Sequence, residues 1–248
     1  MHPVNFYTEL LMIALIDCRA SKKTLDALNN YGFEPLLMPP SPSLGRGVAS
    51  HTDMLVFIGF GRLFCHASYY ENNKKIIDSI ASAGKLTICL SDEEWSQKYP
   101  RDVLFNACLI KKKLICNENT VSKHILNAAH NSGAEVINVK QGYTKCSICK
   151  VSENAIITSD RHIAKICESV DIDTLLIREG HISLPPYNFG FIGGTSGQYN
   201  DSVYFCGSFS AHPDGNVINE FCLKHEKKAI SLSDEKLQDI GSIFFIGE

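Results

Sequence analysis

Residues Leu237–Glu248 read LQDIGSIFFIGE, so the sequence ends inside an apolar run that is typical of a buried β-strand. A strand at the edge of a sheet leaves a row of backbone donors and acceptors unpaired until another strand lies beside it. We therefore expect a second segment of the sequence to pair with this one. The position of that partner segment decides the fold.

Four windows of the sequence share one plan, in which an apolar strand, a polar or glycine-containing turn, a second short strand, a helix and a third strand follow one another. Their starts lie 49, 42 and 44 residues apart, at Asp53, Asp102, Thr144 and Asn188. Apolar residues recur at the i, i+3, i+4 spacing of an amphipathic helix within residues 72–83 and 121–131. Four matches in the same order indicate an internal repeat.

A fifth copy of this plan is divided between the two ends of the sequence. Residues 12–18 predict a strand, residues 21–32 a helix that ends at a glycine, and residues 33–38 another strand. This unit lacks its first strand, and the C-terminal run supplies one. We therefore expect Ile13–Asp17 to be the partner of the C-terminal strand, so that each strand protects the edge of the other.

The repeat predicts an α/β fold of five ββαβ blades around a pseudo-fivefold axis. It is a five-bladed propeller closed by pairing of the N- and C-terminal strands. The helices are expected on the outside, and the first strands of the blades line a central cleft. We expect residues 12–248 to form a single domain and residues 1–11 to be an N-terminal extension.

Composition and charge argue against several classes of protein. The chain has 248 residues, 44% hydrophobic and 21% charged, with a net charge of −3, so no nucleic-acid partner is expected. No apolar run reaches the roughly 18 residues of a membrane-spanning helix, and the first residues lack the basic start of a signal peptide. We therefore expect a cytoplasmic protein with no membrane partner, whose ten cysteines are reduced. The sequence does not predict an oligomeric state.

Three stretches carry a resemblance to a known superfamily. Each lies at the start of a module: SHTDMLVF at residues 50–57, YPRDVLFNACLI at residues 99–110, and DEKLQDIGSIFF at residues 234–245. Together with the modular order, they resemble the pentein superfamily, also called the guanidino-group modifying enzyme (GME) fold. That superfamily includes arginine and agmatine deiminases, dimethylarginine dimethylaminohydrolase, amidinotransferases and a non-enzymatic ribosomal anti-association factor. The chain most resembles a bacterial subgroup of this fold whose function is not characterised.

The resemblance implies a chemistry for the central cleft. Catalytic members use a cysteine near the C-terminus as nucleophile, a histidine early in the fourth module as acid and base, and carboxylates that hold the guanidinium. By this resemblance the nucleophile belongs near Phe244 and the histidine at about Thr144, and neither residue type is present there. Ser242 and Thr144, which stand at or near these two positions, are candidates for binding a ligand.

Charged and polar residues near two strand starts are further candidates for a ligand site. Asp53, Arg101 and Asp102 could hold a zwitterion such as an amino-acid-like ligand, or could act as strand caps and a structural Arg–Asp pair. Asn106 lies four residues past Asp102, on the same face of the predicted strand. It could line the pocket or bond to the backbone of the ring.

Cys146 is the candidate for a displaced nucleophile. It is predicted on the first strand of the fourth module, on the same face as Thr144, and a low-pKa thiol there would react first with an alkylating reagent. The alternative is a small buried core residue, since no histidine lies nearby in the sequence. Cys146 and Cys149 form a CxxC, but on a strand they point to opposite faces, so we expect no metal site.

The glycine-rich stretch at residues 193–197 resembles a phosphate-binding loop only in part. It contains no lysine and leads toward another strand rather than a helix. A hairpin or a lid over the cleft is therefore expected there, and we expect no cofactor.

The sequence supports two functions of different classes. The first is a divergent, hydrolase-like or amidinotransferase-like member that binds a small guanidino or amino-acid-like ligand at the axis. The second is a non-catalytic scaffold that uses the ring as a rigid interaction surface, as the ribosome-binding branch of the superfamily does. A concave polar pocket on the axis would favour the first, and a filled axis with a flat apolar outer patch would favour the second.

Overall fold

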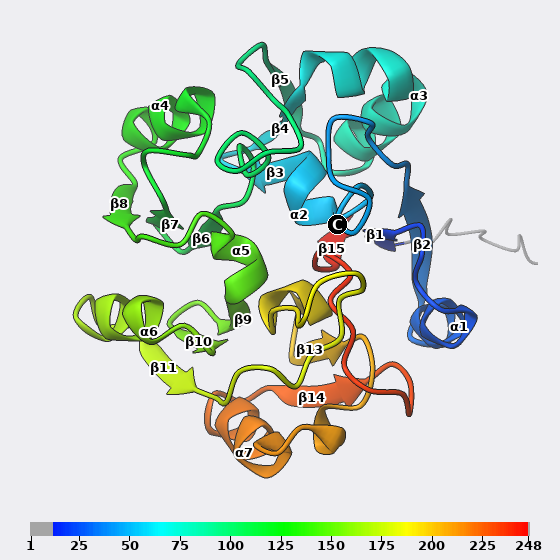
Figure 1. Ribbon diagram of the computed structural model, residues 1–248, viewed down its shortest axis with the longest axis vertical. Helices are drawn as coiled ribbons and strands as arrows, with labels where there is room; N and C mark the ends of the chain where they lie inside the picture. The colour runs from blue at the N-terminus through cyan, green and yellow to red at the C-terminus, as the bar shows by residue number, and fades with distance from the viewer. Residues whose placement is uncertain (1–11, 248) are drawn as a thin grey trace, which may run out of the picture.

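The computed structural model describes residues 12–247, which form five three-stranded sheets arranged in a ring with helices on the outside (Figure 1). The expected N-terminal extension, residues 1–11, lies outside the described residues. The ring confirms the prediction of a five-bladed α/β-propeller.

Every blade repeats the same ββαβ order. The inner strand pairs antiparallel with the middle strand, and a helix then leads to an outer strand that lies parallel to the middle one. The inner strand, middle strand, helix and outer strand are, blade by blade: β15 (Phe244–Ile246), β1 (Met12–Asp17), α1 (Lys22–Asn30) and β2 (Phe33–Met38); β3 (Val56–Gly59), β4 (Arg62–His66), α3 (Ala67–Ala83) and β5 (Thr87–Ser91); β6 (Cys108–Ile110), β7 (Lys113–Cys116), α4 (Lys123–Asn131) and β8 (Glu135–Asn138); β9 (Cys149–Ser152), β10 (Ala155–Thr158), α6 (Arg161–Glu168) and β11 (Asp173–Leu176); β12 (Ser196–Tyr199), β13 (Ser202–Phe205), α7 (Gly215–Lys224) and β14 (Lys228–Ser231).

The first blade is the one that the sequence divides between its two ends. β15 pairs antiparallel with β1, with Leu15 opposite Phe244 and Ile13 opposite Ile246. The Phe245 ring packs against Phe33 of β2, with ring centroids 4.5 Å apart. The predicted closure by Ile13–Asp17 is therefore confirmed, and both edges of β1 are paired.

The outer helices form where an apolar stripe follows a capping residue. In α6 the Asp160 carboxylate accepts hydrogen bonds from the backbone N–H groups of His162 and Ile163, and the helix buries Ile163 and Cys167 on one face. α3 begins at Ala67, five residues before the predicted start at residue 72, because His66 caps the backbone N–H of Ser68. The strand β4 runs directly into this cap.

Three of the segments expected to be strands begin instead with a short helical turn. These turns are α2 (Thr52–Leu55), α5 (Thr144–Ser147) and the 3₁₀ turn η1 (Gly193–Thr195), which precede β3, β9 and β12. A single turn is too short to display the helical period, so its apolar residues were indistinguishable from strand residues. The prediction that Asp53 and Cys146 start or occupy strands is therefore wrong. The glycine-rich stretch is buried rather than an exposed lid.

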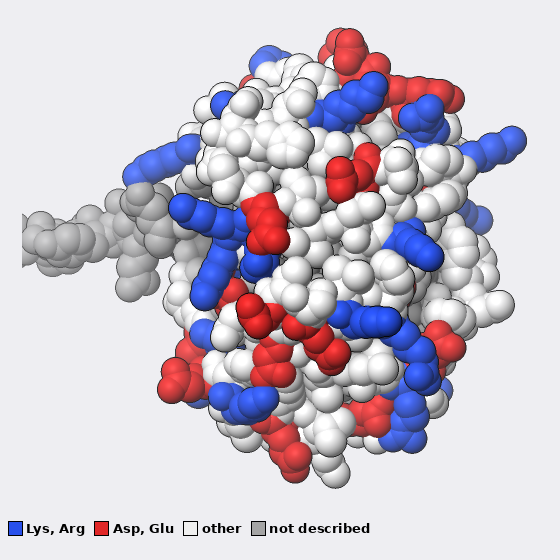
Figure 2. All heavy atoms as spheres, turned by 90° about the vertical axis from the view of Figure 1, so that its left-hand side faces the viewer, with Lys and Arg blue, Asp and Glu red and all other residues white. Residues whose placement is uncertain are grey.

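The surface carries mixed charge, and the ten cysteines are free thiols. Figure 2 shows one face, on which basic and acidic side chains are interspersed.

Among residues 12–247, no helix combines the length and the hydropathy needed to cross a bilayer. A second 3₁₀ turn, η2 (Phe209–Ala211), lies between β13 and α7.

Candidate functional site

The segments that lead into four of the inner strands bring four predicted site residues together at the axis. Asp53 lies in α2 ahead of β3, and Asn106 lies in the turn ahead of β6. Cys146 lies in α5 ahead of β9, and Ser242 lies just ahead of β15. None of the four is more than 3% exposed. We call Asp53, Asn106, Cys146 and Ser242 the polar cluster.

The thiol of Cys146 is held between a carboxylate and an amide. Its Sγ donates to Asp53 Oδ1 at 3.3 Å and accepts from Asn106 Nδ2 at 3.1 Å. The amide also donates to the backbone carbonyl of Asp53 at 3.1 Å, and its oxygen accepts from the backbone N–H of Cys146 at 3.2 Å. Asn106 therefore joins the segments that carry Asp53 and Cys146 into one rigid unit.

Ser242 connects the carboxylate of Asp53 to a lysine. Its Oγ lies 2.6 Å from Asp53 Oδ2 and 3.0 Å from the carbonyl oxygen of Gly193. Because a hydroxyl has one proton, we assign it to the shorter contact with the carboxylate. Lys145 donates from Nζ to the same Oγ at 2.8 Å. A chain of hydrogen bonds thus runs from Lys145 through Ser242 to Asp53 and on to Cys146.

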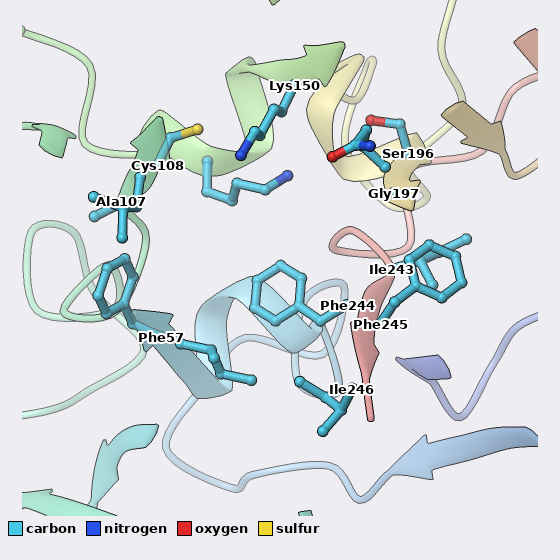
Figure 3. Close-up of a pocket in the computed structure, with 14 residues that line it drawn as sticks. Phe57, Ala107, Cys108, Lys150, Ser196, Gly197, Ile243, Phe244, Phe245 and Ile246 are labelled. Carbon is cyan, nitrogen blue, oxygen red and sulfur yellow. The ribbon is translucent and has the colours of Figure 1, made fainter. Parts of the chain in front are cut away.

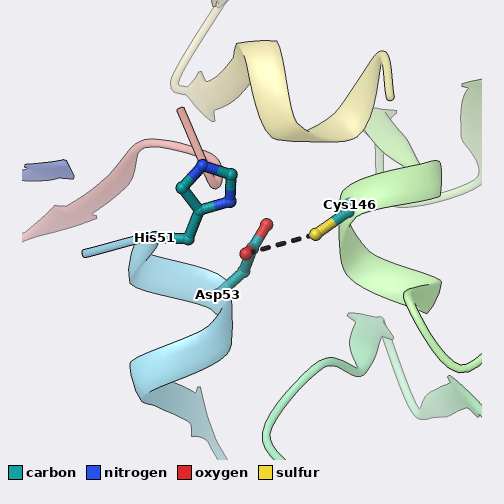
Figure 4. Close-up of side chains that lie close together, drawn as sticks. All are labelled: His51, Asp53 and Cys146. Atoms are coloured by element: carbon teal, nitrogen blue, oxygen red, sulfur yellow. Dashed lines mark hydrogen bonds between the residues drawn. The ribbon is translucent and has the colours of Figure 1, made fainter. Parts of the chain in front are cut away.

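His51 stands beside this cluster without a hydrogen bond at either ring nitrogen. The residue is 1% exposed, and Figure 4 shows its ring next to Asp53, with Cys146 across the gap. Nε2 lies 3.7 Å from Asp17 Oδ2, and Nδ1 lies 3.8 Å from Asp239 Oδ1. A buried imidazole with unpaired nitrogens is costly unless it serves a ligand or a proton transfer.

Asp239 is the second buried carboxylate near the thiol. It accepts backbone hydrogen bonds from Phe191 at 2.9 Å and from Gly241 at 3.0 Å. Burial raises the pKa of Asp239, while His51 lowers it and Asp53 raises it further. The carboxylate fits only because residue 194 is glycine, since a Cβ there would lie 1.9 Å from Asp239 Oδ1. The site therefore holds a carboxylate whose ionised form gains from an added positive charge.

Burial also controls the reactivity of Cys146. It raises the pKa of the Cys146 thiol well above its usual value of 9.0, and the carboxylates of Asp53 and Asp239 raise it further. The thiol is therefore protonated at neutral pH when the site holds no ligand, contrary to the low-pKa thiol considered from the sequence. A positive charge placed between the thiol and these carboxylates would act in the opposite direction.

Three of these side chains also have the geometry of a metal-binding group. Donor atoms of His51, Asp53 and Cys146 all lie within 4.8 Å of one another (Figure 4). Imidazole nitrogen, carboxylate oxygen and thiolate sulfur are ligands that Zn²⁺ accepts. Two of the three already satisfy each other through the Cys146–Asp53 hydrogen bond. The group was not found from the sequence because His51 and Cys146 belong to different blades.

An aromatic pocket of about 290 Å³ opens above the polar residues. His51 and Asp239, which are 1% and 2% exposed, form its floor, whereas Tyr187 and Phe189, 49% and 39% exposed, stand at its rim. The Tyr143 and Phe191 rings stack with centroids 6.2 Å apart. The aromatic pocket is lined by Val48, His51, Tyr143, Cys146, Leu184, Tyr187, Asn188, Phe189, Phe191 and Asp239.

Three predicted site residues lie outside the polar cluster. Asp102 is buried, and its Oδ2 accepts a hydrogen bond from the Tyr143 hydroxyl at 2.5 Å, so it supports the pocket wall. Burial raises the pKa of Asp102. The Arg101 side chain is 50% exposed and pairs with Glu94 at 3.4 Å. The Thr144 hydroxyl donates to the carbonyl oxygen of Gln141, also at 2.5 Å.

Three residues of the site are not among the candidates chosen from the sequence: His51, Lys145 and Asp239. His51 and Asp239 both lie inside stretches that the sequence singled out, two residues before Asp53 and three before Ser242. On a strand, residues three apart point to opposite faces, so a strand through Ser242 would turn Asp239 away from the axis. The helical turns and the tight bend at Gly241 bring these residues to the axis instead.

Comparison with solved structures shows the same fold in enzymes of low sequence identity. Dimethylarginine dimethylaminohydrolase from Pseudomonas aeruginosa, in complex with citrulline, superposes with a TM-score of 0.56 at 11% identity, covering 89% of this chain and 90% of that one. The N-terminal domain of ArgZ, a cyanobacterial arginine dihydrolase, gives 0.56 at 9% identity, covering 89% and 90%. Agmatine deiminase from C. jejuni gives 0.52 at 7% identity, covering 89% and 87%. The chain has the fold of these pentein, or guanidino-group modifying, enzymes.

Comparison by sequence gives a family rather than an individual relative. No protein with a curated description matches the chain. Residues 15–244, which include all five blades except the ends of the first one, match a family that is described as a family of unknown function. The chain belongs to that family, DUF6873.

Proposed function

We propose that this chain binds a small guanidino compound in the aromatic pocket and hydrolyses it through Cys146. The single observation that supports this most strongly is the meeting of a thiol, an unpaired imidazole and two carboxylates at the floor of that pocket. The fold neighbours named above are, by their names, a dimethylarginine dimethylaminohydrolase, an agmatine deiminase and an arginine dihydrolase, and the substrates in these names are guanidino compounds. The open pocket also supports a ligand-binding protein over a scaffold with a filled axis.

The pocket has the chemistry of a cation site. Aromatic faces attract cations, and the rings of Tyr143, Tyr187 and Phe191 surround the entrance to the polar floor. Asp239 presents a buried carboxylate there, and each of its oxygens has accepted only one backbone hydrogen bond. A carboxylate oxygen can accept more than one, so capacity remains for the planar donors of a guanidinium.

The order of proton transfers follows from the distances. Cys146 Sγ would attack the central guanidino carbon while its proton passes to Asp53 Oδ1, 3.3 Å away. The C–N bond to the departing amine then breaks, and His51 beside the site supplies the proton that this amine needs. Water then attacks the resulting thiouronium carbon and gives one proton to His51. The C–S bond breaks, the Cys146 sulfur takes back the proton that Asp53 had accepted, and the remaining proton of the water leaves with the released amine as its ammonium ion.

The bound cation itself compensates for the raised pKa of the thiol. Burial and two carboxylates disfavour the thiolate in the free protein. A guanidinium against Asp239 adds one positive charge next to Cys146, which favours the thiolate and the ionised carboxylate together. The proposal therefore requires that the thiol reacts with cationic ligands and stays inert toward neutral ones of the same size.

Ligand binding is tested by calorimetric titration of the full chain with agmatine, arginine and dimethylated arginines. Citrulline, whose ureido group is neutral, is the charge control. We expect the guanidino compounds to bind at least tenfold more tightly than citrulline, and Asp239→Asn to remove most of this preference. Asp234→Asn is the matched control, because Asp234 is an exposed carboxylate that pairs only with Lys23 in the described residues. Absence of binding by every guanidino compound would overturn the proposal.

Catalysis is tested separately from binding. The release of ammonia or an amine from the tightest ligand is followed with the wild type and with Cys146→Ala. We expect turnover by the wild type only, with ligand affinity within about threefold in the variant, because the thiol acts on the bound ligand rather than holding it. If the wild type binds the ligand without turning it over, the chain is a ligand-binding protein and Cys146 has no catalytic role.

A further inference from the structure

A second pocket lies on the axis, between the inner strands rather than above them. Its volume is about 270 Å³, and every one of the five inner strands contributes to its wall (Figure 3). We call it the axial pocket. It is lined by Phe57, Ile58, Ala107, Cys108, Leu109, Lys145, Lys150, Ser196, Gly197, Gln198, Ile243, Phe244, Phe245 and Ile246.

The axial pocket combines an apolar wall with two lysines. Figure 3 shows Lys150 reaching in from β9, while Phe57 of β3 and Phe244 of β15 face the same space. The residues that line the pocket include no aspartate or glutamate. Its charge is therefore opposite in sign to that of the aromatic pocket, whose floor holds Asp239.

The two ammonium groups differ in how they are neutralised. Lys150 pairs with Glu153, whose side chain is 55% exposed. Lys145 forms no ion pair with any residue between 12 and 247, and its Nζ donates only to Ser242 Oγ at 2.8 Å and, weakly, to the carbonyl oxygen of Ile148 at 3.5 Å. A partly buried ammonium without a carboxylate partner is stabilised by an anion from outside the chain.

We propose that the axial pocket binds a small organic carboxylate with an apolar body. The carboxylate would bridge Lys145 Nζ and Lys150 Nζ, and the apolar body would contact the rings of Phe57 and Phe244. The volume corresponds to roughly nine water molecules, which limits the ligand to about the size of an aromatic or branched aliphatic acid. The lysines act as point charges, and the apolar remainder of the pocket favours a carboxylate over the more strongly hydrated phosphate.

This site is independent of the guanidino site proposed above. An anion is repelled from the aromatic pocket by Asp239 and Asp53, and a guanidinium is repelled from the axial pocket by its two lysines. Hydrogen bonds from Lys145 through Ser242 to Asp53 link the two pockets. Each proposal nevertheless has its own class of ligand and its own titration, so failure of one leaves the other standing.

Four probes that separate charge from apolar contact test the inference. Benzoate carries both features, benzyl alcohol lacks the charge, benzylamine reverses it, and acetate lacks the apolar body. In calorimetric titrations we expect benzoate to bind at least tenfold more tightly than each of the other three, because a charge-assisted contact and the apolar burial are both needed. Equal affinity for benzoate and benzyl alcohol would overturn the proposal, as would no measurable binding of benzoate.

Substitutions locate the bound benzoate. Lys145→Met keeps the aliphatic stem and removes the charge, so benzoate should bind about tenfold more weakly. Lys150→Met should weaken the binding of benzoate only about threefold, because Glu153 already neutralises that lysine in part. Lys165→Met, on the exposed face of α6, is the matched control and should leave benzoate affinity unchanged. Lys150→Met should also leave agmatine affinity unchanged.

Folding of each variant is checked by its thermal transition before titration. Lys150→Met is the decisive variant if Lys145→Met proves unstable, since Lys150 lies outside the polar cluster. The assignment is overturned if Lys150→Met binds benzoate as tightly as the wild type and Lys145→Met, where it folds, does so too. The bound acid would then lie elsewhere.

Discussion

The aromatic pocket and the axial pocket lie on the same axis but are built from different parts of the five inner segments. The aromatic pocket stands on the turns ahead of the strands, where Asp53 accepts hydrogen bonds from both Cys146 and Ser242 and all three are almost fully buried. The axial pocket lies between the strands themselves, and Phe57 and Phe244 are two of the apolar residues that line it. In a ring of repeated blades, equivalent positions converge on the axis whatever their side chains are. The turns ahead of the inner strands, which we call the turn level, therefore meet at one height of the axis, and the inner strands, which we call the strand level, meet at another. Each level has its own chemistry.

The two levels are also held together by different contacts. Asn106 and Ser242 tie the turns together through side-chain hydrogen bonds, whereas the strand level is held by the sheets of each blade. Substitutions at the turn level should therefore affect stability and ligand chemistry together. Substitutions at the strand level should mainly affect the size and charge of the pocket.

The largest effect is expected from deleting residues 243–248, which removes β15 and with it one of the five inner strands. β1 loses its antiparallel partner, and the Phe33 ring loses its contact with Phe245. We expect loss of the cooperative thermal transition, followed by circular dichroism. An undiminished transition would contradict closure by this strand.

A circular permutant is the control for that deletion. Joining residue 246 to residue 12 by a short linker and opening the chain between Glu179 and Gly180, which are exposed and lie between two blades, keeps every strand pair. This permutant should keep the cooperative transition. Its failure to fold would show that the deletion acts through something other than the missing strand.

The next largest effect is expected from Gly194→Ala at the turn level. The added Cβ would lie 1.9 Å from Asp239 Oδ1, so the buried carboxylate must move and loses its backbone donors. We expect a loss of about 2–4 kcal/mol in the free energy of unfolding, measured by urea denaturation. Gly45→Ala is the control, because its Cβ would meet only the Tyr187 hydroxyl at 3.3 Å, and it should cost less than about 1 kcal/mol. Equal losses would contradict the tight fit around Asp239.

A smaller effect is expected from the pH dependence of two thiols, one at each level. The folded-state pKa of Cys146 is raised well above 9.0, and that of Cys149 in β9 is raised to about 11 by burial. A raised pKa favours the protonated folded state, so the stabilisation is complete below pH 9 and is lost as the pH rises. Each thiol should lower the free energy of unfolding by about 1.4 kcal/mol per pH unit in its window.

Serine variants separate the two windows in urea denaturation under reducing conditions. Cys149→Ser should flatten the wild-type decline between pH 9 and about 11, where the thiol of the folded state itself ionises. Cys146→Ser should flatten the wild-type decline from pH 9 upward, with no upper limit near pH 11. The reason is that Asp53 and Asp239 raise the folded-state pKa of the Cys146 thiol further than burial alone does. Identical profiles for Cys146→Ser and the wild type would contradict the buried, carboxylate-flanked thiol.

The ring was predictable from the sequence because the repeat survives as a pattern of strands and helices. The split blade followed from the same pattern, since a C-terminal strand without a unit and an N-terminal unit without its first strand complete each other. Four of the candidate site residues lie together at the axis, because each precedes an inner strand by two or three residues. Their roles remain proposals.

The parts that sequence reasoning could not supply depend on single turns and on long-range geometry. Arg101 was grouped with Asp102 because the two are adjacent, but its side chain turns outward to Glu94. His51 and Asp239 face each other from opposite ends of the sequence across 3.8 Å, which no local pattern encodes. One of the two lysines of the axial pocket, Lys145, comes to Ser242 by the same kind of contact.

The central claim is that the floor of the aromatic pocket selects a cation and presents it to Cys146. It is tested most directly by mapping, with mass spectrometry, the cysteine that reacts first with chloroacetamidine, a cationic amidine, and with the neutral chloroacetamide. We expect chloroacetamidine to modify Cys146 first, chloroacetamide to modify the exposed Cys18 first, and Asp239→Asn to remove the preference for Cys146. Modification of Cys18 ahead of Cys146 by both reagents would contradict the account.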